Sequence, residues 1–245
     1  MYRYLKGGVL AGGVAGVAYG LFLATIATPL TEHLHAVSHD HGHDHGHAAG
    51  EAATLVTEST TALVSVGGGL LWAIFLGGLF GLALFVLEPA LPGTERVKAH
   101  VLAGCGFLTI SAIPWLVMPP ATPSSEHLYG IDTRLAIYGG LVLVGAIVAA
   151  SAVGLYTRTA GRHRLLRVLS AGIPLGAAVV VLPTITPTIV SHPGVRTDLV
   201  VAYQAMVVVG QAGIWLLIAS AFNWLRGRGG STPAAGSTDR APESA

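Results

Sequence analysis

The stretch VGGGLLWAIFLGGLFGLALFVL, residues 66–87, decides the fold class of this chain, because it is long, apolar and free of charged side chains. A helix needs about 20 consecutive apolar residues to cross a bilayer. Within the stretch, Gly69, Ala73, Gly77 and Gly81 recur at every fourth position, and residues four apart lie on one face of a helix. The stretch therefore predicts a membrane-spanning helix with a strip of small residues along one side.

Five further runs of similar length and composition accompany it. The 245-residue chain is 52% hydrophobic and 10% charged, whereas soluble domains carry about 25% charged residues. Backbone groups in hydrocarbon must all be hydrogen-bonded, and the runs lack the alternation of barrel strands, so we expect helices. The sequence predicts an all-α, polytopic integral membrane bundle with six transmembrane helices, near 7–28, 66–87, 99–118, 135–156, 168–190 and 199–222. The first run exceeds the apolar part of a signal peptide, which predicts an uncleaved helix.

Lysine and arginine predict the orientation of these helices, because cytoplasmic loops beside spanning helices are rich in both. Eleven of the 13 basic residues fall before the first helix, after the sixth, between the second and third, or between the fourth and fifth. Only Arg134 and Arg196 fall in the other connections. We therefore expect both termini to be cytoplasmic, with residues 29–65, 119–134 and 191–198 outside.

The outer connection 29–65 contains HDHGHDHGH at 39–47, where histidine occupies every second position. Neutral imidazole binds transition metals, and neighbouring carboxylates add oxygen ligands. Histidine-rich tracts are a composition typical of metal binding. The predicted metal-binding residues are Glu32, His33, His35, His39, Asp40, His41, His43, Asp44, His45 and His47.

Other interpretations of these histidines stay open. A solvated low-complexity linker would have the same composition without binding metal, and imidazoles titrating near pH 6.5 suit a pH sensor. Capture also differs from transport, because a loose tract can concentrate ions while the selective site lies elsewhere. The spacing does not choose the metal, since selectivity follows geometry and availability.

A second strip of small residues runs along the first predicted helix, at Gly8, Gly12, Gly16 and Gly20. Such strips let membrane helices approach closely, because packing drives helix association in lipid. The strips on the first two helices predict tight packing, either against each other or against another protein.

Prolines gather toward the outer ends of the first, third and fifth predicted helices. An interior proline frees a backbone carbonyl that can coordinate a cation, although proline is also simply more frequent in membrane helices. Ionisable residues inside spans mark transport paths, and they are nearly absent here, which leaves neutral polar side chains as candidates. The predicted lining of a translocation path is Pro114, Pro119, Pro183, Gln204, Gln211 and Glu88, the last at the cytoplasmic end of the second helix.

Motifs of the common enzyme classes are missing from the sequence. It contains no HExxH metalloprotease motif, no GxSxG nucleophile elbow and no GxxxxGK[ST] phosphate loop. It also lacks a basic patch with interleaved aromatic residues. We therefore expect no catalytic residues, no permanently bound cofactor and no nucleic-acid partner.

Three segments carry a resemblance to a known family. PLTEHLH at 29–35 leads into the histidine-rich loop, IPWLVMPPATP at 113–123 closes the third helix, and LPTITP at 182–187 lies in the fifth. With these segments the chain resembles the CbtA family. The resemblance implies a cobalt transporter subunit linked to cobalamin synthesis and paired with a small, one-helix, histidine-bearing subunit of the CbtB type. That family is generally described with five spanning helices, whereas the runs here predict six.

Together these observations predict a multi-pass cell membrane protein that takes up a divalent transition metal captured by its outer loop. The resemblance implies Co2+, while the ligand chemistry alone also admits a Ni2+ or Zn2+ permease, or a membrane metal sensor or scaffold that does not transport. We expect a transmembrane domain over 1–226 and a disordered tail over 227–245, which is rich in Gly, Ser, Pro and Ala. The expected partners are the lipid bilayer, the CbtB-type subunit and, in a homo-oligomer, further copies of the chain.

Overall fold

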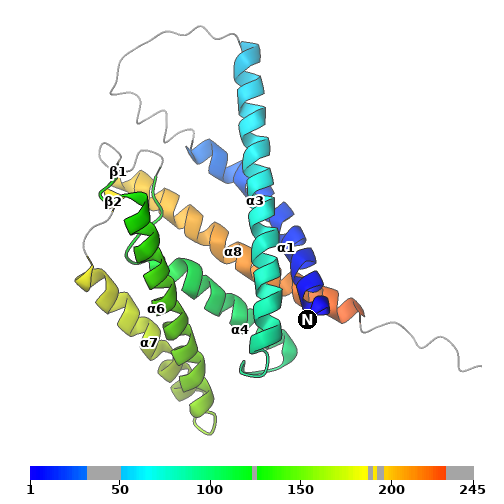
Figure 1. The fold of residues 1–245 in the computed structure, drawn as a ribbon, viewed down its shortest axis with the longest axis vertical. Helices are drawn as coiled ribbons and strands as arrows, with labels where there is room; N and C mark the ends of the chain where they lie inside the picture. Colours follow the sequence, from blue (N-terminus) through cyan, green and yellow to red (C-terminus); the bar gives the residue numbers. More distant parts are fainter. Residues whose placement is uncertain (32–50, 123–125, 187–189, 192–195, 230–245) are drawn as a thin grey trace, which may run out of the picture.

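The computed structural model describes residues 1–31, 51–122, 126–186, 190–191 and 196–229, and this part of the chain is a bundle of long helices (Figure 1). Six helices within it are long and apolar enough to cross a membrane, which confirms the predicted fold class. These spans are Tyr2–Thr31, Val66–Leu87, Glu95–Trp115, Ile131–Arg158, Arg164–Ile185 and Thr197–Arg228. Residues 32–50, with the histidine tract, and residues 230–245 of the predicted tail lie outside the described residues.

The helices follow one another up and down the bundle. They are α1 (Tyr2–Phe22) with a π-helical turn η1 (Leu23–Ala27), α3 (Glu51–Leu87), α4 (Glu95–Phe107) with a π-helical turn η2 (Leu108–Ala112) and α5 (Ile113–Trp115), α6 (Ile131–Arg158), α7 (Arg164–Ile185) and α8 (Thr197–Gly229). Two short strands, β1 (Glu126–His127) and β2 (Val190–Ser191), pair antiparallel with Glu126 opposite Ser191. This pair joins the connection before α6 to the connection before α8 at one end of the bundle (Figure 1).

Helices α3 and α8 extend beyond the spans that the sequence predicted. A loop was expected through residue 65, but α3 already begins at Glu51. Residues 51–65 contain neither proline nor glycine, the two residues that most strongly stop a helix, so the helix extends beyond the apolar run. At the other terminus α8 runs to Gly229, so the first residues of the predicted tail are helical.

Helices α1 and α3 pack against each other through the two strips of small residues. A side-chain carbon added at Gly8 would collide with the carbonyl oxygen of Gly77, and one at Gly12 with that of Ala73. At the other end of the contact, a carbon added at Gly20 would lie 2.9 Å from Cγ1 of Val66. The two backbones therefore touch directly, which supplies the close packing that holds helices together in lipid. Each strip thus contacts the other strip within the same chain.

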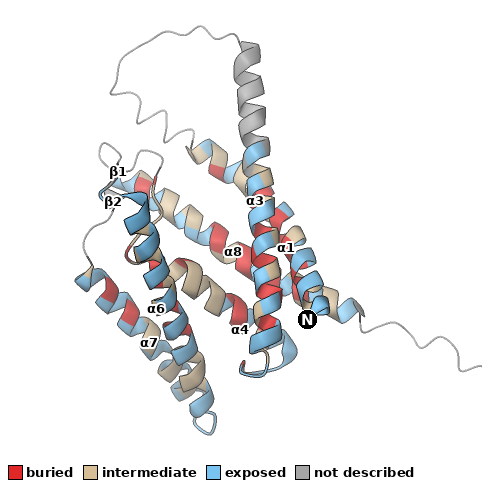
Figure 2. Cartoon of the chain, viewed as in Figure 1, coloured by how far each residue is buried: buried red, intermediate tan, exposed pale blue. Residues whose placement is uncertain are grey.

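The larger of two apolar cores lies between α1, α3, α4 and α8. Its largest fully buried side chains include Leu76 and Phe80 of α3 and Ile218 of α8. Figure 2 shows buried residues on the facing sides of these helices. Helix α4 joins this core at Gly106, where the ring of Trp215 occupies the space that a side chain would fill. The outer faces of the helices expose many large apolar residues, as expected of surfaces that contact lipid.

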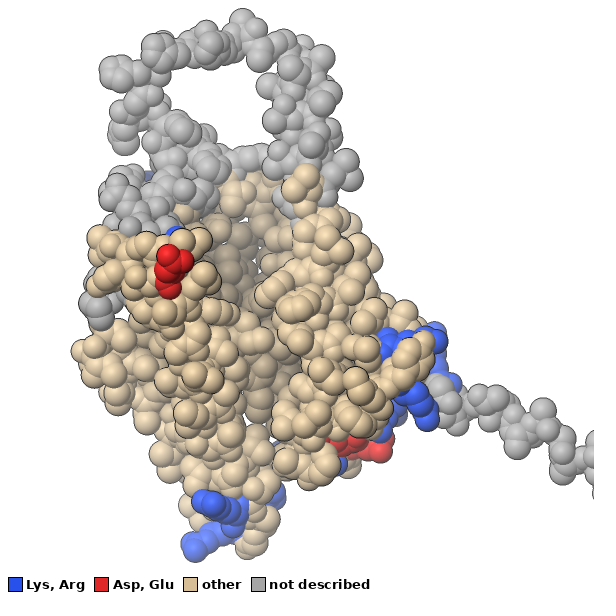
Figure 3. Space-filling model, in the orientation of Figure 1, with Lys and Arg blue, Asp and Glu red and all other residues tan. Residues whose placement is uncertain are grey.

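A second, smaller core joins α5, α6 and α7. Its buried residues are Ile113, Val117, Leu141, Val148, Ala178 and Leu182. Between the two cores lies an apolar cavity of about 510 Å³, lined by residues that include Ala83, Cys105, Ala150 and Trp215. Figure 3 shows the molecular surface hollowed between α3 and α6, so the bundle consists of two helix groups joined along α4, η2 and α8.

Candidate functional site

The predicted metal-binding residues, from Glu32 to His47, all lie outside the described residues, so their role stays a prediction. The structure defines the two helices that flank them: the first span ends at Thr31 and α3 begins at Glu51. Among the described residues, no three His, Cys, Asp or Glu side chains form a group that could hold a metal ion.

Polar groups of the predicted path meet where α8 begins. The side-chain amide of Gln204 donates a 3.4 Å hydrogen bond to the backbone carbonyl of Pro120. Pro119 and Pro120 follow α5, where two consecutive prolines prevent the helix from continuing. Thr122, two residues further, is buried, and its hydroxyl has no hydrogen-bond partner in the described part of the chain. Gln204 and residues 120–122 therefore contribute an amide, a backbone carbonyl and a hydroxyl group at this end of the bundle.

Gln211 continues the same face of α8 deeper into the bundle. It is 8% exposed and lies seven residues after Gln204, which places it two turns further on, or about 10 Å along the helix axis. Pro183 lies apart from this face, because it is exposed on the surface of α7. The structure thus places Gln204 against the segment of Pro119 and Gln211 further along the same face of α8, and it separates Pro183 from them.

Pro114 is fully buried and frees the carbonyl of Ile110, four residues before it. The hydroxyl of Tyr138, on α6, donates a 2.9 Å hydrogen bond to this carbonyl. Ile110 lies in the π-helical turn η2. Here the freed carbonyl connects two helices of the bundle.

The first and third spans contain the same local device. Each has a π-helical turn of five residues, η1 and η2, that begins six residues before a proline, Pro29 or Pro114. The sequences FLATIATP at 22–29 and FLTISAIP at 107–114 share the pattern Phe-Leu-x-x-x-Ala-x-Pro. Single π-helical turns inside α-helices are frequent at functional sites. The prolines of these spans were predicted to free backbone carbonyls, but the shared sequence pattern was not recognised before the two π-helical turns were seen.

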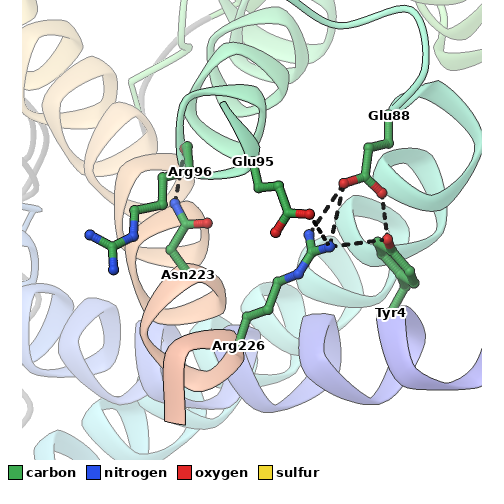
Figure 4. Close-up of polar contacts among 6 residues, drawn as sticks. All are labelled: Tyr4, Glu88, Glu95, Arg96, Asn223 and Arg226. Atoms are coloured by element: carbon green, nitrogen blue, oxygen red, sulfur yellow. Dashed lines mark hydrogen bonds and ion pairs between the residues drawn. The ribbon is translucent and has the colours of Figure 1, made fainter. Parts of the chain in front are cut away.

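Glu88 lies at the opposite end of the bundle, in a charged group that we call the inner-end cluster: Tyr4, Glu88, Glu95 and Arg226 (Figure 4). Arg226 Nη1 is 3.4 Å from Glu88 Oε1, and its Nη2 is 3.3 Å from Glu95 Oε1. The Tyr4 hydroxyl donates a hydrogen bond to Glu88 and accepts one of 3.4 Å from Arg226. Because α8 rises about 1.5 Å per residue, Arg226 lies about 33 Å along the helix from Gln204.

The hydrogen bond from Tyr4 is the main reason why the pKa of Glu88 lies below its ordinary value of 4.5. Partial burial raises this pKa, whereas the positive charge of Arg226 lowers it further. The carboxylate of Glu88 is therefore ionised at neutral pH and is held as an anion by its partners.

A second polar contact supports the cluster from the neighbouring turn of α8. The side-chain amide of Asn223 donates a 3.0 Å hydrogen bond to the carbonyl of Arg96 on α4 (Figure 4). Together with Arg226 it connects the end of α8 to the start of α4. The sequence predicted Glu88 as a residue of the translocation path. Its partners Tyr4, Glu95 and Arg226 were not predicted, because they come from separate parts of the chain.

Comparison with known proteins decides the family. A family model described as a probable cobalt transporter subunit (CbtA) matches residues 1–227, which is nearly the whole chain. The chain belongs to the CbtA family. No curated protein and no solved structure is significantly similar to it.

CbtA membership and the six apolar helices together make the chain a multi-pass protein of the cell membrane. In this CbtA protein, the described residues place neutral polar groups at one end of the bundle and the inner-end cluster at the other. Apolar cores occupy the length between them.

Proposed function

We propose that this chain is the membrane-spanning subunit of a cobalt uptake system for cobalamin synthesis, with a histidine-rich outer loop that captures Co2+. The observation that carries the proposal is the position of seven histidines between the first two spans of a CbtA-family protein. Imidazole and carboxylate groups in one connection supply the ligands that a divalent transition metal needs.

The distribution of charge supports an outer position for the loop. In the view of Figure 3, most lysine and arginine side chains lie at the end of the bundle that holds the inner-end cluster. The helix ends Thr31 and Glu51, which flank the histidine-rich connection, are at the other ends of their helices. The basic residues include Arg3 at the start of α1, Arg158 at the end of α6 and Arg228 at the end of α8. Because positive residues favour the cytoplasmic side, both termini are inside and the loop faces the incoming metal.

The polar face of α8 is the proposed route inward. Gln204 and the segment of Pro119 form its outer part, and Gln211 lies two turns deeper, next along the same face. Pro114 shapes the neighbouring span. Pro183, exposed on α7, would line the route only where another subunit covers that face.

The inner-end cluster closes the route at the cytoplasmic side in this proposal. Arg226 connects the end of α3 to the start of α4, and its hydrogen bond to Tyr4 connects both to α1. Release of an ion to the cytoplasm requires these helix ends to separate, so Glu88 acts by holding them together.

A partner subunit completes the system. The family is described as a transporter subunit, and a small one-helix, histidine-bearing protein of the CbtB type is the proposed partner. Further copies of this chain are the alternative partner. Two rival functions also remain to be tested: a Ni2+ or Zn2+ permease, and a sensor or scaffold that binds metal without transporting it.

Flux of radioactive Co2+ into liposomes tests the proposal. The purified chain is reconstituted with and without a CbtB-type subunit, and a variant with all seven loop histidines replaced by alanine is compared with the wild type. We expect the variant to need a Co2+ concentration roughly tenfold or more above that of the wild type for the same influx. Loss of residues that contact a metal only through its ligands already lowers metal affinity by about that factor. His100→Ala/His163→Ala is the matched control, because both histidines lie on or beside helices at the opposite end.

The outcomes separate the rival functions. Influx that is unchanged in the seven-histidine variant would remove the capture role. Metal binding without influx, with or without the second subunit, would indicate a sensor or scaffold. Stronger competition by Ni2+ or Zn2+ than by unlabelled Co2+ would assign another metal.

A further inference from the structure

A cavity of about 520 Å³ lies between the inner ends of α1 and α8, and it shares Tyr4 and Arg226 with the inner-end cluster. It is lined by Tyr2, Arg3, Tyr4, Lys6, Gly7 and Leu10 of α1 and by Phe222, Leu225 and Arg226 of α8. The lining changes from basic to apolar along the helices. Arg3 and Arg226 lie in the terminal turns of α1 and α8, and Leu10 lies about two turns deeper than Arg3. The cavity therefore has a basic rim at the membrane surface and an apolar floor toward the bilayer.

The rim carries positive charge that the protein does not neutralise. Arg3 and Lys6 are exposed, and neither has an ion-pair partner within the described ranges. Arg226 shares the rim, although Glu88 and Glu95 already contact its guanidinium. A negatively charged group at the rim would meet at least two available cations.

The floor is formed by the contact between α1 and α8. A side-chain carbon added at Gly7 would lie 3.0 Å from Cε2 of Phe222, and the rings of Tyr4 and Phe222 are 6.3 Å apart. Leu10, about two turns deeper than Arg3, extends this apolar surface away from the rim, and Leu225 lies on α8 beside Arg226. A hydrocarbon chain would gain contacts on such a surface that a small inorganic anion would not.

We propose that this cavity binds an anionic phospholipid, with the phosphate group beside Arg3 and Lys6 and an acyl chain along Phe222 and Leu10. Lysine and arginine form strong charge-assisted hydrogen bonds with phosphate oxygens. Basic pockets between membrane helices on the cytoplasmic side are a known setting for anionic headgroups. The site would connect α1 to α8 beside the inner-end cluster without taking part in metal binding.

Native mass spectrometry of the full-length protein in detergent tests the site, with dioleoylphosphatidylglycerol as the probe. We expect Arg3→Gln/Lys6→Gln to weaken binding by roughly thirtyfold, because each basic residue near the surface contributes roughly a factor of five. Arg162→Gln/Arg164→Gln removes the same charge from two exposed residues, one in the turn between α6 and α7 and one at the start of α7. This control should leave the affinity unchanged.

Two further probes decide whether the ligand is a lipid. Dioleoylphosphatidylcholine should bind more weakly and with equal affinity to the wild type and to Arg3→Gln/Lys6→Gln. Inorganic phosphate should neither bind nor displace the lipid at equal concentration. Equal affinity for the two lipids, an equal loss in the control variant, or displacement by phosphate would each overturn the proposal. Thermal unfolding without added lipid checks folding, and Lys6→Gln alone, with roughly a fivefold loss, replaces the double variant if that variant does not fold.

Discussion

Arg226 meets two carboxylates of the same type in two different surroundings. The side chain of Glu88 is 19% exposed and also accepts a hydrogen bond from Tyr4, whereas that of Glu95 is 67% exposed. Exposed ion pairs are screened by water and contribute little, while hydrogen bonds to a partly buried charge contribute more. The two contacts of one guanidinium should therefore differ in their effect on stability.

Glu88→Gln is expected to lower the free energy of unfolding by about 1–2 kcal/mol, because it removes the charge that Tyr4 and Arg226 both bind. Denaturant titration of the purified protein in detergent measures this change. Glu95→Gln, which loses the exposed contact with the same arginine, should cost less than about 0.5 kcal/mol. Equal losses of unfolding free energy in the two variants would contradict the larger contribution expected of the less exposed carboxylate.

The contribution of Glu88 also depends on pH. Its pKa in the folded protein lies below the ordinary value of 4.5, so its stabilisation is complete above pH 4.5 and is lost as the pH falls through the lower, folded value. The difference in melting temperature between wild type and Glu88→Gln should therefore be constant near neutral pH and should shrink in acid below pH 4.5. A difference that grows in acid would contradict the assigned direction of the pKa shift.

The contact between α1 and α3 shows how a repeated small residue determines the packing of two elements. Gly8 faces the backbone of Gly77, whereas a carbon added at Gly13, on the same helix, would meet nothing within 4 Å. Gly8→Ala should lower the free energy of unfolding by roughly 1–3 kcal/mol, the usual cost of overpacking. Gly13→Ala is the control and should be neutral or slightly stabilising, because alanine favours helix more than glycine does. Unfolding in SDS compares the two, and equal effects would contradict the direct backbone contact.

The link between η2 and α6 depends on one hydroxyl group. Tyr138→Phe removes the hydrogen bond to the carbonyl of Ile110 and leaves that carbonyl without the donor that compensates for Pro114. We expect a loss of about 1–2 kcal/mol in the same unfolding experiment. Tyr156→Phe, the same change on the same helix, should have a smaller effect, because the Tyr156 ring contacts Arg167 and its hydroxyl makes no hydrogen bond within the described residues. A larger loss for Tyr156→Phe would contradict this assignment.

The orientation of the whole molecule is testable by labelling intact cells with a maleimide that does not cross membranes. In a Cys105→Ala background, Ser38→Cys in the histidine-rich loop should react without lysis, because the distribution of basic residues predicts an outer position for that loop. Gly161→Cys, in the turn between α6 and α7, should react only after lysis. The reverse pattern would invert the topology and remove the proposed role of the loop in uptake.

The sequence by itself determined the fold class, because apolar length and the absence of charge are local properties of each run. It also placed the histidine-rich connection between two spans and predicted that Gly8 and Gly77 belong to packing surfaces. It did not show how far α3 and α8 extend beyond the apolar runs, since propensity rather than hydropathy governs the helix there. The sequence offered proline and glutamine residues as candidates for the route, but it did not show which of them lie near one another.

Only the tertiary structure decided which surfaces and charges meet. It brought Arg226 to Glu88, 138 positions apart, paired the two glycine strips with each other, and gave the carbonyl freed by Pro114 a donor from another helix. These are long-range contacts, set by how helices approach in three dimensions, and no local pattern specifies the partner of a side chain. Hydropathy determines that each apolar segment forms a helix in the membrane. The shapes of the helix faces determine which helices pack against each other.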